Sequence, residues 1–224
     1  MPMSTPPLRA VAFDLDGLMF NTEDLYDLVG ARILARRGQQ FTAELKRAMM
    51  GRPSPVALQI MIDRHQLQDT VDQLEQESDV LFAEILATDL APLAGLESLL
   101  DALEAAALPK AIATSSRRSF TRTVLSRFDL EPRFAFLLTS EDVVQGKPHP
   151  EIYLKAASRL GVPPQQMLVL EDSENGCRAA VAAGAYTVAV PSPHSHQHDF
   201  AGVALTADSL ADPRIYQALG LTAG

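Results

Sequence analysis

The stretch Ala10-Val-Ala-Phe13-Asp14-Leu-Asp16-Gly17 runs from four apolar residues directly into two aspartates and a glycine. The apolar residues predict a short buried strand, and Gly17 permits the sharp turn that ends it. Asp14 and Asp16 are two residues apart, so on an extended chain their carboxylates point the same way. Carboxylates held close together repel each other and need a cation or a shared proton. A solvated acidic turn is the alternative for this pattern taken alone.

After residue 90, helix-like and apolar segments alternate along the chain. Helix-like segments cover 98–107, 119–128, 150–160 and 177–183, and short apolar runs follow at 111–113, 134–138, 167–170 and 187–190. This alternation predicts an α/β fold: a Rossmann-like parallel sheet of five strands, counting Ala10–Phe13, with helices on both faces. Ligands of such sheets bind at the carboxyl ends of the strands, so chemistry is expected just after each apolar run.

Residues 20–89 have a different, helical texture with little clustering of β-branched residues. The apolar residues of its first segment fall on one face of a helix: Leu25, Leu28, Val29, Ile33 and Leu34. Three more helix-like segments follow before residue 89. We therefore expect an α/β core made of 1–19 and 90–224, with a small helical domain, 20–89, inserted after the first strand.

Two later segments offer groups that could hold an anion. Thr114-Ser115-Ser116-Arg117 follows an apolar run and precedes a helix, so its hydroxyls and backbone amides form a potential anion site. Helix capping by serine is the simpler alternative. Gly146-Lys147-Pro148-His149-Pro150 opens another helix, and a lysine fixed there can act as a point charge for phosphate instead of facing solvent.

Glu171 and Asp172 follow the apolar run 167–170. Carboxylates that abut an apolar strand are costly unless they are paired or bound to a metal ion. Oxygen ligands of this kind suit Mg²⁺, which often shares a substrate phosphate. Each strand end is weak evidence alone. Together they place an acid pair, an anion site, a lysine and metal-binding carboxylates on one edge of one sheet.

Composition excludes several classes of protein. The chain has 224 residues, 47% hydrophobic and 21% charged, which is ordinary for a globular protein, and its net charge of −9 argues against nucleic acid and anionic membranes as partners. Apolar runs stay well short of a membrane span, and Met1–Arg9 lacks the apolar region of a secretory signal. Cys177, the single cysteine, cannot form an internal disulfide, so we expect a reducing, cytoplasmic location.

In these motifs the chain resembles the haloacid-dehalogenase superfamily, in the branch with a helical cap after the first strand. The resemblance covers Val11 to Val190, and its four motifs correspond in order to Asp14-Leu-Asp16-Gly17, Thr114-Ser115, Lys147 and Glu171-Asp172. Within the superfamily, Gly17–Glu23, Met50-Gly51-Arg52 and Ala113–Arg117 are similar to sugar-phosphate phosphatases and pseudouridine-5′-phosphatase. Asn21 departs from the aspartate that is usual in this branch, which bears on substrate choice more than on chemistry.

The resemblance implies a mechanism and a metal. Asp14 would attack phosphorus to form an aspartyl-phosphate, and Asp16 would protonate the leaving alcohol and then accept a proton from water. Mg²⁺ would be held by Asp14, the Asp16 carbonyl and Asp172, with Glu171 as a direct or outer ligand.

The resemblance also implies which groups contact the substrate. Thr114, Ser115 and Lys147 would hold the phosphoryl oxygens, and Met19, Phe20 and Arg52 are the candidates for substrate contacts at the closing cap. A small phosphorylated metabolite is the expected partner of what we take to be a monomer.

Three functions are compatible with these motifs. Asp16 argues for a phosphatase, because dehalogenases of the superfamily lack an acid there and its ATPases carry threonine. A β-phosphoglucomutase-like mutase is the alternative, but its cap arginine would fall at Ser54, which favours the phosphatase. A binding module without turnover is disfavoured by the intact motifs. Three alternating histidines, His194, His196 and His198, could bind zinc, although a solvated loop is the better interpretation.

Overall fold

The computed structural model describes residues 7–49, 52 and 54–222. Contacts divide the chain into two compact units, one formed by the chain up to Asn21 and from Ala91 onward, the other by Thr22–Leu90. The chain leaves and re-enters the first unit at adjoining residues, because the Asn21 amide donates to the Ala91 carbonyl (3.2 Å) and the Ala91 amide donates to Asn21 Oδ1 (2.8 Å). An aspartate would offer the same side-chain oxygen, so the departure at residue 21 preserves this contact.

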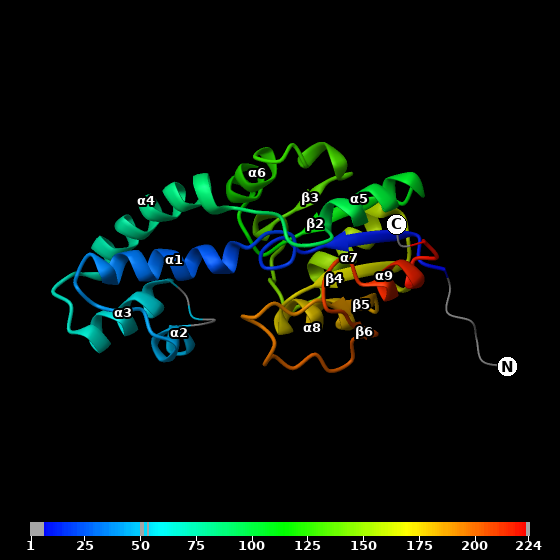
Figure 1. Cartoon of the computed structure of the whole chain (residues 1–224). Coiled ribbons are helices and arrows are strands. Elements are labelled where there is room, and N and C mark those ends of the chain that lie inside the picture. The colour runs from blue at the N-terminus through cyan, green and yellow to red at the C-terminus, as the bar shows by residue number, and fades with distance from the viewer. Residues whose placement is uncertain (1–6, 50–51, 53, 223–224) are drawn as a thin grey trace. The chain divides into compact units, whose positions relative to one another are not determined.

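The first unit contains a six-stranded, all-parallel sheet in the order β3-β2-β1-β4-β5-β6 (Figure 1). Its strands are β1 (Ala10–Phe13), β2 (Lys110–Ala113), β3 (Leu137–Leu138), β4 (Met167–Glu171), β5 (Tyr186–Ala189) and β6 (Leu205–Thr206). The predicted α/β class with a parallel sheet is confirmed. The expected number of five strands is wrong by one, because the edge strand β6 follows β5 with no helix between them and so falls outside the alternation of helices and strands on which the prediction rests.

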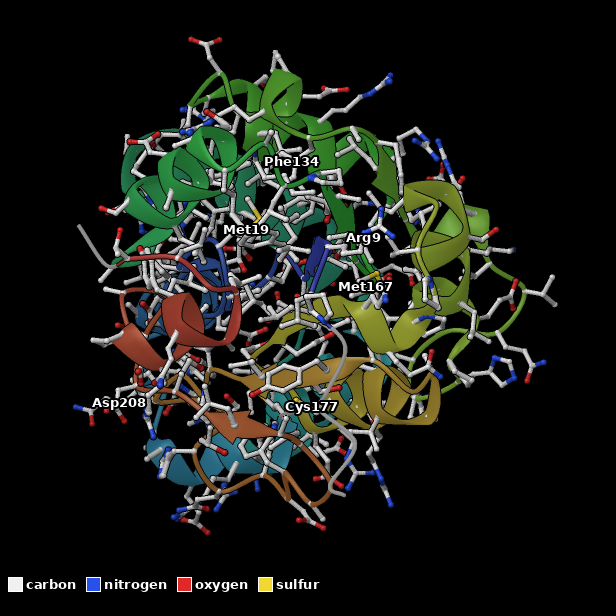
Figure 2. The ribbon with its side chains drawn as sticks, turned by 90° about the vertical axis from the view of Figure 1, so that its right-hand side faces the viewer. Arg9, Met19, Phe134, Met167, Cys177 and Asp208 are labelled. Atoms are coloured by element: carbon white, nitrogen blue, oxygen red, sulfur yellow. The ribbon has the colours of Figure 1, made fainter. Side chains whose placement is uncertain are left out.

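Helices cover both faces of this sheet, as its fully buried strands require. They are α5 (Leu96–Ala105), α6 (Arg118–Ser126), α7 (Glu151–Leu160), α8 (Glu174–Ala182) and α9 (Pro213–Ala218), with 3₁₀ turns at Glu131–Arg133, Ser140–Asp142 and Pro164–Gln166. Figure 2 shows α7 and α8 on one side of the sheet and α5 and α9 on the other. The α7–α8 face encloses an apolar cluster that includes Tyr153, Val169 and Ala180.

The strand order reverses at β1, and this positions the site. From β1 the chain adds β2 and β3 on one side, then β4, β5 and β6 on the other. In α/β sheets the crevice at such a reversal is where ligands bind. The register pairs Phe13 with Ile112 on one side and with Leu170 on the other, so the residues that follow these three strands emerge side by side.

The second unit is helical. It contains α1 (Thr22–Ala35), α2 (Ala43–Met49), α3 (Ser54–His65) and α4 (Val71–Asp89), with α1 packed on α4 and α2 on α3. A capping box of Thr70 and Gln73 begins α4. Just beyond α1, Arg37 donates to both oxygens of Asp69 (2.9 and 2.7 Å) and to Glu77 (2.7 Å), which ties the end of α1 to α4.

Candidate active site

The acidic residues of the site are attached directly to the sheet. The Asp14 amide donates to the Leu170 carbonyl (3.0 Å), one step beyond the paired residues of β1 and β4. Thr114 does the same one step beyond β2, where its amide donates to the Leu138 carbonyl (3.0 Å). Because these hydrogen bonds continue the pairing of the strands, the backbone fixes where the Asp14 and Thr114 side chains begin at the carboxyl ends of β1 and β2.

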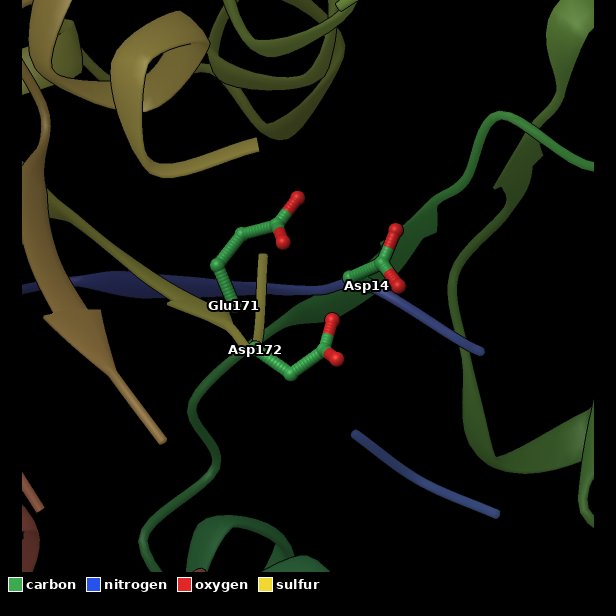
Figure 3. Close-up of side chains that lie close together, drawn as sticks. All are labelled: Asp14, Glu171 and Asp172. Carbon is green, nitrogen blue, oxygen red and sulfur yellow. The ribbon is translucent and has the colours of Figure 1, made fainter. Parts of the chain in front are cut away.

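Three carboxylates converge there. Asp14, Glu171 and Asp172 are all buried, and one oxygen from each lies within 4.8 Å of the others. Figure 3 shows the three groups turned toward a common space. Buried carboxylates repel one another in a medium of low dielectric, so this arrangement needs positive charge to be stable.

Lys147 supplies part of that charge. Its Nζ donates to Asp14 Oδ1 (2.5 Å), Glu171 Oε1 (2.6 Å) and the Ala113 carbonyl (2.9 Å), and its side chain is 5% exposed. Burial alone would lower the Lys147 pKa, but Asp14 and Glu171 together raise it above its usual value. The lysine therefore stays charged between the two carboxylates.

One ammonium does not balance the acids. The pKa of Asp14 is raised to about 8, first by burial and then by Glu171 and Asp16, although Lys147 acts in the opposite direction. A buried group of oxygen donors with excess negative charge matches the preference of Mg²⁺ for hard anionic ligands. Asp14, Asp172 and Glu171 thus fit a divalent cation by their chemistry.

Asp16 has a partner that sequence reasoning missed. Gly17, at φ 72°, turns the chain, and the Ser116 hydroxyl donates to Asp16 Oδ2 (2.5 Å) from the neighbouring strand end. The Ser116 amide in turn donates to Thr114 Oγ1 (3.0 Å). Ser116 lies in the hydroxyl-rich segment that the sequence singled out, but its pairing with a residue 100 positions away had no local signal.

The three residues expected to hold phosphate line one cavity of about 330 Å³. Thr114, Ser115 and Lys147 contribute polar groups, and Val144 and Ile152 are among the apolar residues of its wall. A cavity of this size admits a small ligand.

Glu171 is held from several sides. Its Oε1 accepts from the Tyr153 hydroxyl (2.6 Å) as well as from Lys147, and its Oε2 accepts from the Ser173 hydroxyl (3.1 Å). A Cβ on Gly176 would lie 1.8 Å from Oε1, so only glycine leaves room for the carboxylate. The Tyr153 pKa is raised well above its usual value, first by burial and then by Glu171, so its hydroxyl keeps its proton. Sequence reasoning missed Tyr153, which has the pattern of an ordinary core residue.

The residues expected to contact the substrate at the cap are divided between the two units. Met19 and Phe20 belong to the α/β unit and are fully buried, and Phe20 stacks on Phe128 with ring centroids 5.3 Å apart. Arg52 is exposed in the helical unit, and its neighbours Met50 and Gly51 lie outside the described residues.

The histidines at 194–198 and Cys177 do not join the candidate metal cluster of the described residues. Within the described part of the chain, the residues that could jointly hold a metal are Asp14, Glu171 and Asp172, and the histidines at 194–198 are not among them. His198 Nδ1 instead accepts from the Glu174 amide (3.4 Å) at the start of α8. Burial raises the pKa of the Cys177 thiol, which keeps it protonated. None of the helices among the described residues has the length and apolar character needed to span a membrane.

Comparison with known proteins identifies the class to which this fold and site belong. The family profile of haloacid dehalogenase-like hydrolases matches residues 11–190, and the chain belongs to this family.

Individual relatives are named for the reactions that they catalyse. The chain is 33% identical to a phosphorylated carbohydrates phosphatase of Thermotoga maritima, over 79% of this chain and 82% of that protein. It is 34% identical to a candidate pseudouridine-5′-phosphatase of Drosophila melanogaster, over 94% of both chains. A solved structure of a candidate β-phosphoglucomutase of Thermotoga maritima superposes with a TM-score of 0.83 at 28% identity, covering 95% of this chain and 97% of that one. The names of the first two relatives support a phosphoric monoester hydrolase.

Proposed function

We propose that this chain is a Mg²⁺-dependent phosphatase that hydrolyses a small phosphate monoester, a sugar phosphate or a nucleoside monophosphate, through an aspartyl-phosphate intermediate. The observation that carries the proposal is the buried grouping of Asp14 with Lys147, Glu171 and Asp172 at the switch point of the sheet. The cavity lined by Thr114, Ser115 and Lys147 supports the proposal, because Lys147 also contacts Asp14 and Glu171 of this grouping.

Each step has a residue to perform it. A carboxylate oxygen of Asp14 attacks phosphorus, and the bond from phosphorus to the ester oxygen breaks as Asp16 donates a proton to the leaving alcohol. Asp16 then takes a proton from a water molecule that attacks the aspartyl-phosphate, and inorganic phosphate leaves as the Asp14 carboxylate is restored. Lys147, the Thr114 hydroxyl and the Ser115 amide hold the phosphoryl oxygens as their charge changes.

The metal is proposed on the donor set alone. Asp14, Asp172 and the carbonyl oxygen of Asp16 would hold Mg²⁺, with Glu171 as a direct or outer ligand. When bound, the ion offsets the repulsion between a carboxylate nucleophile and a phosphate dianion.

The helical unit is proposed to act as a cap that excludes bulk water during the reaction. In that role Arg52 would contact the substrate from the helical unit, and Met19 and Phe20 would contact it from the α/β unit. We further propose that the enzyme acts as a monomer on a metabolite in the cytoplasm, which a single cysteine favours.

A phosphomutase is the second candidate, because a candidate β-phosphoglucomutase is among the solved structures with this fold. Ser54 begins α3 where a mutase of this type would carry an arginine, which favours hydrolysis. Glucose 1-phosphate with a bisphosphate activator distinguishes the two: accumulation of glucose 6-phosphate would establish the mutase, and release of inorganic phosphate the phosphatase.

The direct test is hydrolysis of p-nitrophenyl phosphate in Mg²⁺, followed by a phosphate-release screen over sugar phosphates and nucleotides. Asp14→Asn should abolish activity, and Asp16→Asn should lower kcat by about 10²–10⁴. Circular dichroism would verify that both variants are folded. Substantial activity in folded Asp14→Asn would remove the nucleophile, and with it the proposed mechanism.

A further inference from the structure

A buried tyrosine contacts two of the charged residues of the site, Glu171 and Lys147. Tyr153, on α7, is fully buried, and its hydroxyl donates to Glu171 Oε1 (2.6 Å). The same oxygen accepts from Lys147 Nζ (2.6 Å), and that nitrogen lies 5.1 Å from the centroid of the Tyr153 ring. Tyr153 therefore contacts both members of the Lys147–Glu171 pair.

Lys147 is shared between two acids. Its ammonium donates to Asp14 on one side and to Glu171 on the other, so its position depends on how strongly each carboxylate attracts it. The hydroxyls of Tyr153 and Ser173 also donate hydrogen bonds to the Glu171 carboxylate, so Lys147 is not its sole donor. If one of these donors is lost, a buried carboxylate has to recover the interaction from the donors that remain. The nearest of these is the Lys147 ammonium.

We propose that Tyr153 is a positioning residue of this active site, which holds Glu171 so that Lys147 stays directed at Asp14 and at the phosphoryl group bound there. The inference rests on the proposed phosphatase function and names a residue outside its catalytic set. Tyr153 acts through Glu171 and Lys147 and does not touch the substrate.

The competing explanation is that Tyr153 only fills space. Its ring belongs to the apolar cluster between the sheet and the α7–α8 layer, and a phenylalanine would fill that space equally well. The hydroxyl is what separates the two explanations, because packing does not require it and the positioning role does.

The experiment compares the full-length chain with Tyr153→Phe in Mg²⁺. Tyr216→Phe is the matched control, since it removes another tyrosine hydroxyl from a buried residue, on α9. We measure kcat and KM for p-nitrophenyl phosphate, the inhibition constant of inorganic phosphate, the Mg²⁺ concentration for half-maximal activity and the melting temperature. Ser173→Ala removes the donor to the other Glu171 oxygen and also the N-cap of α8, so it is the second variant, measured where it is folded, if Tyr153→Phe does not fold. Weaker phosphate binding in it would support the role of the Glu171 donors, and unchanged kinetics and phosphate binding would overturn the proposal.

For Tyr153→Phe we expect kcat/KM to fall about tenfold and inorganic phosphate to bind several-fold more weakly, because a misplaced lysine holds phosphate less well. Half-maximal activation by Mg²⁺ should change less than phosphate binding does, since the ligands Asp14 and Asp172 are untouched and Glu171 keeps its donors Lys147 and Ser173. Tyr216→Phe should match the parent in all five quantities.

Two outcomes overturn the proposal. Unchanged kinetics and phosphate binding in folded Tyr153→Phe would leave the residue a packing group. A weakened response to Mg²⁺ with unchanged phosphate binding would show that Tyr153 serves a metal ligand instead of the lysine. Failure of the proposed function looks different, because the parent chain itself would then release no p-nitrophenol.

Discussion

The substitution Gly176→Ala has two opposing effects on stability: it raises the helix propensity of α8, and it introduces a Cβ that clashes with Glu171. Gly176 lies in the first turn of α8, where alanine by itself would stabilise the helix by up to about 1 kcal/mol. Its Cβ, however, would lie 1.8 Å from Glu171 Oε1 and 1.9 Å from Glu171 Cδ. Both distances are far below the 3.0 Å under which real Cβ contacts essentially never occur, so the Glu171 carboxylate has to move by about 1.2 Å.

Such a movement breaks the contacts that neutralise Glu171. Its bonds from Tyr153 and Lys147 are 2.6 Å long, and a shift of this size carries at least one beyond hydrogen-bonding distance. Disrupting a buried ion pair costs about 3–5 kcal/mol, so after the gain in helix propensity we expect a net loss of about 2–4 kcal/mol. For a chain of this size the melting temperature should fall by roughly 4–16 °C.

Thermal and urea unfolding followed by circular dichroism measure this loss. Gly146→Ala is the matched control for stability, because a Cβ at Gly146 would meet nothing within 4 Å. A Gly176→Ala variant as stable as the parent, or more stable, would refute the reasoning, since helix propensity would then have outweighed the contact with Glu171.

Three further predictions test charge. The Glu104 pKa is lowered to about 2, chiefly by hydrogen bonds from Arg133, so this carboxylate stabilises the fold above pH 4.5 and loses its effect as the pH falls toward 2. Glu104→Gln should therefore cost at most about 1 kcal/mol at pH 7, because the group is 44% exposed, and less at pH 2, where the carboxylate is about half protonated, as urea titrations at both pH values would check. Arg37→Met, which removes the bidentate pair with Asp69, should lower stability by about 1 kcal/mol and by less in 0.5 M salt; an equal loss at both salt concentrations would contradict an ionic origin. Removal of divalent cations with EDTA should abolish phosphatase activity and added Mg²⁺ should restore it, whereas activity that survives chelation would contradict a cation at the buried carboxylates.

Local patterns were sufficient wherever an apolar strand ran directly into a polar group. The transition from Phe13 to Asp14 predicted both the end of a strand and an acid at the carboxyl end of the sheet. Four consecutive apolar residues are typical of a strand buried on both faces, and such a strand ends where a charged residue follows. The same holds for Glu171, the last residue of β4, and for Asp172, which follows it. Strand β6 was missed because no helix separates it from β5, so it lies outside the alternation of helices and apolar runs.

The contacts within the site follow a different rule. Lys147 and Asp14 are 133 residues apart, and Ser116 and Asp16 are 100 apart, so these pairs form only once parallel strands are in register. Tyr153 has the same spacing on its helix as any core side chain, and its hydroxyl acquires a role only where β4 delivers Glu171 beside it.

The sequence by itself therefore determined the class of fold, the sheet edge and the types of residue gathered there, because strand ends and charge are local properties. Only the tertiary structure decided which carboxylate shares Lys147, why residue 176 is a glycine and what restrains Glu171. Those contacts depend on strand order and register, which bring distant segments within hydrogen-bonding distance and leave no trace in the spacing of residues along the chain.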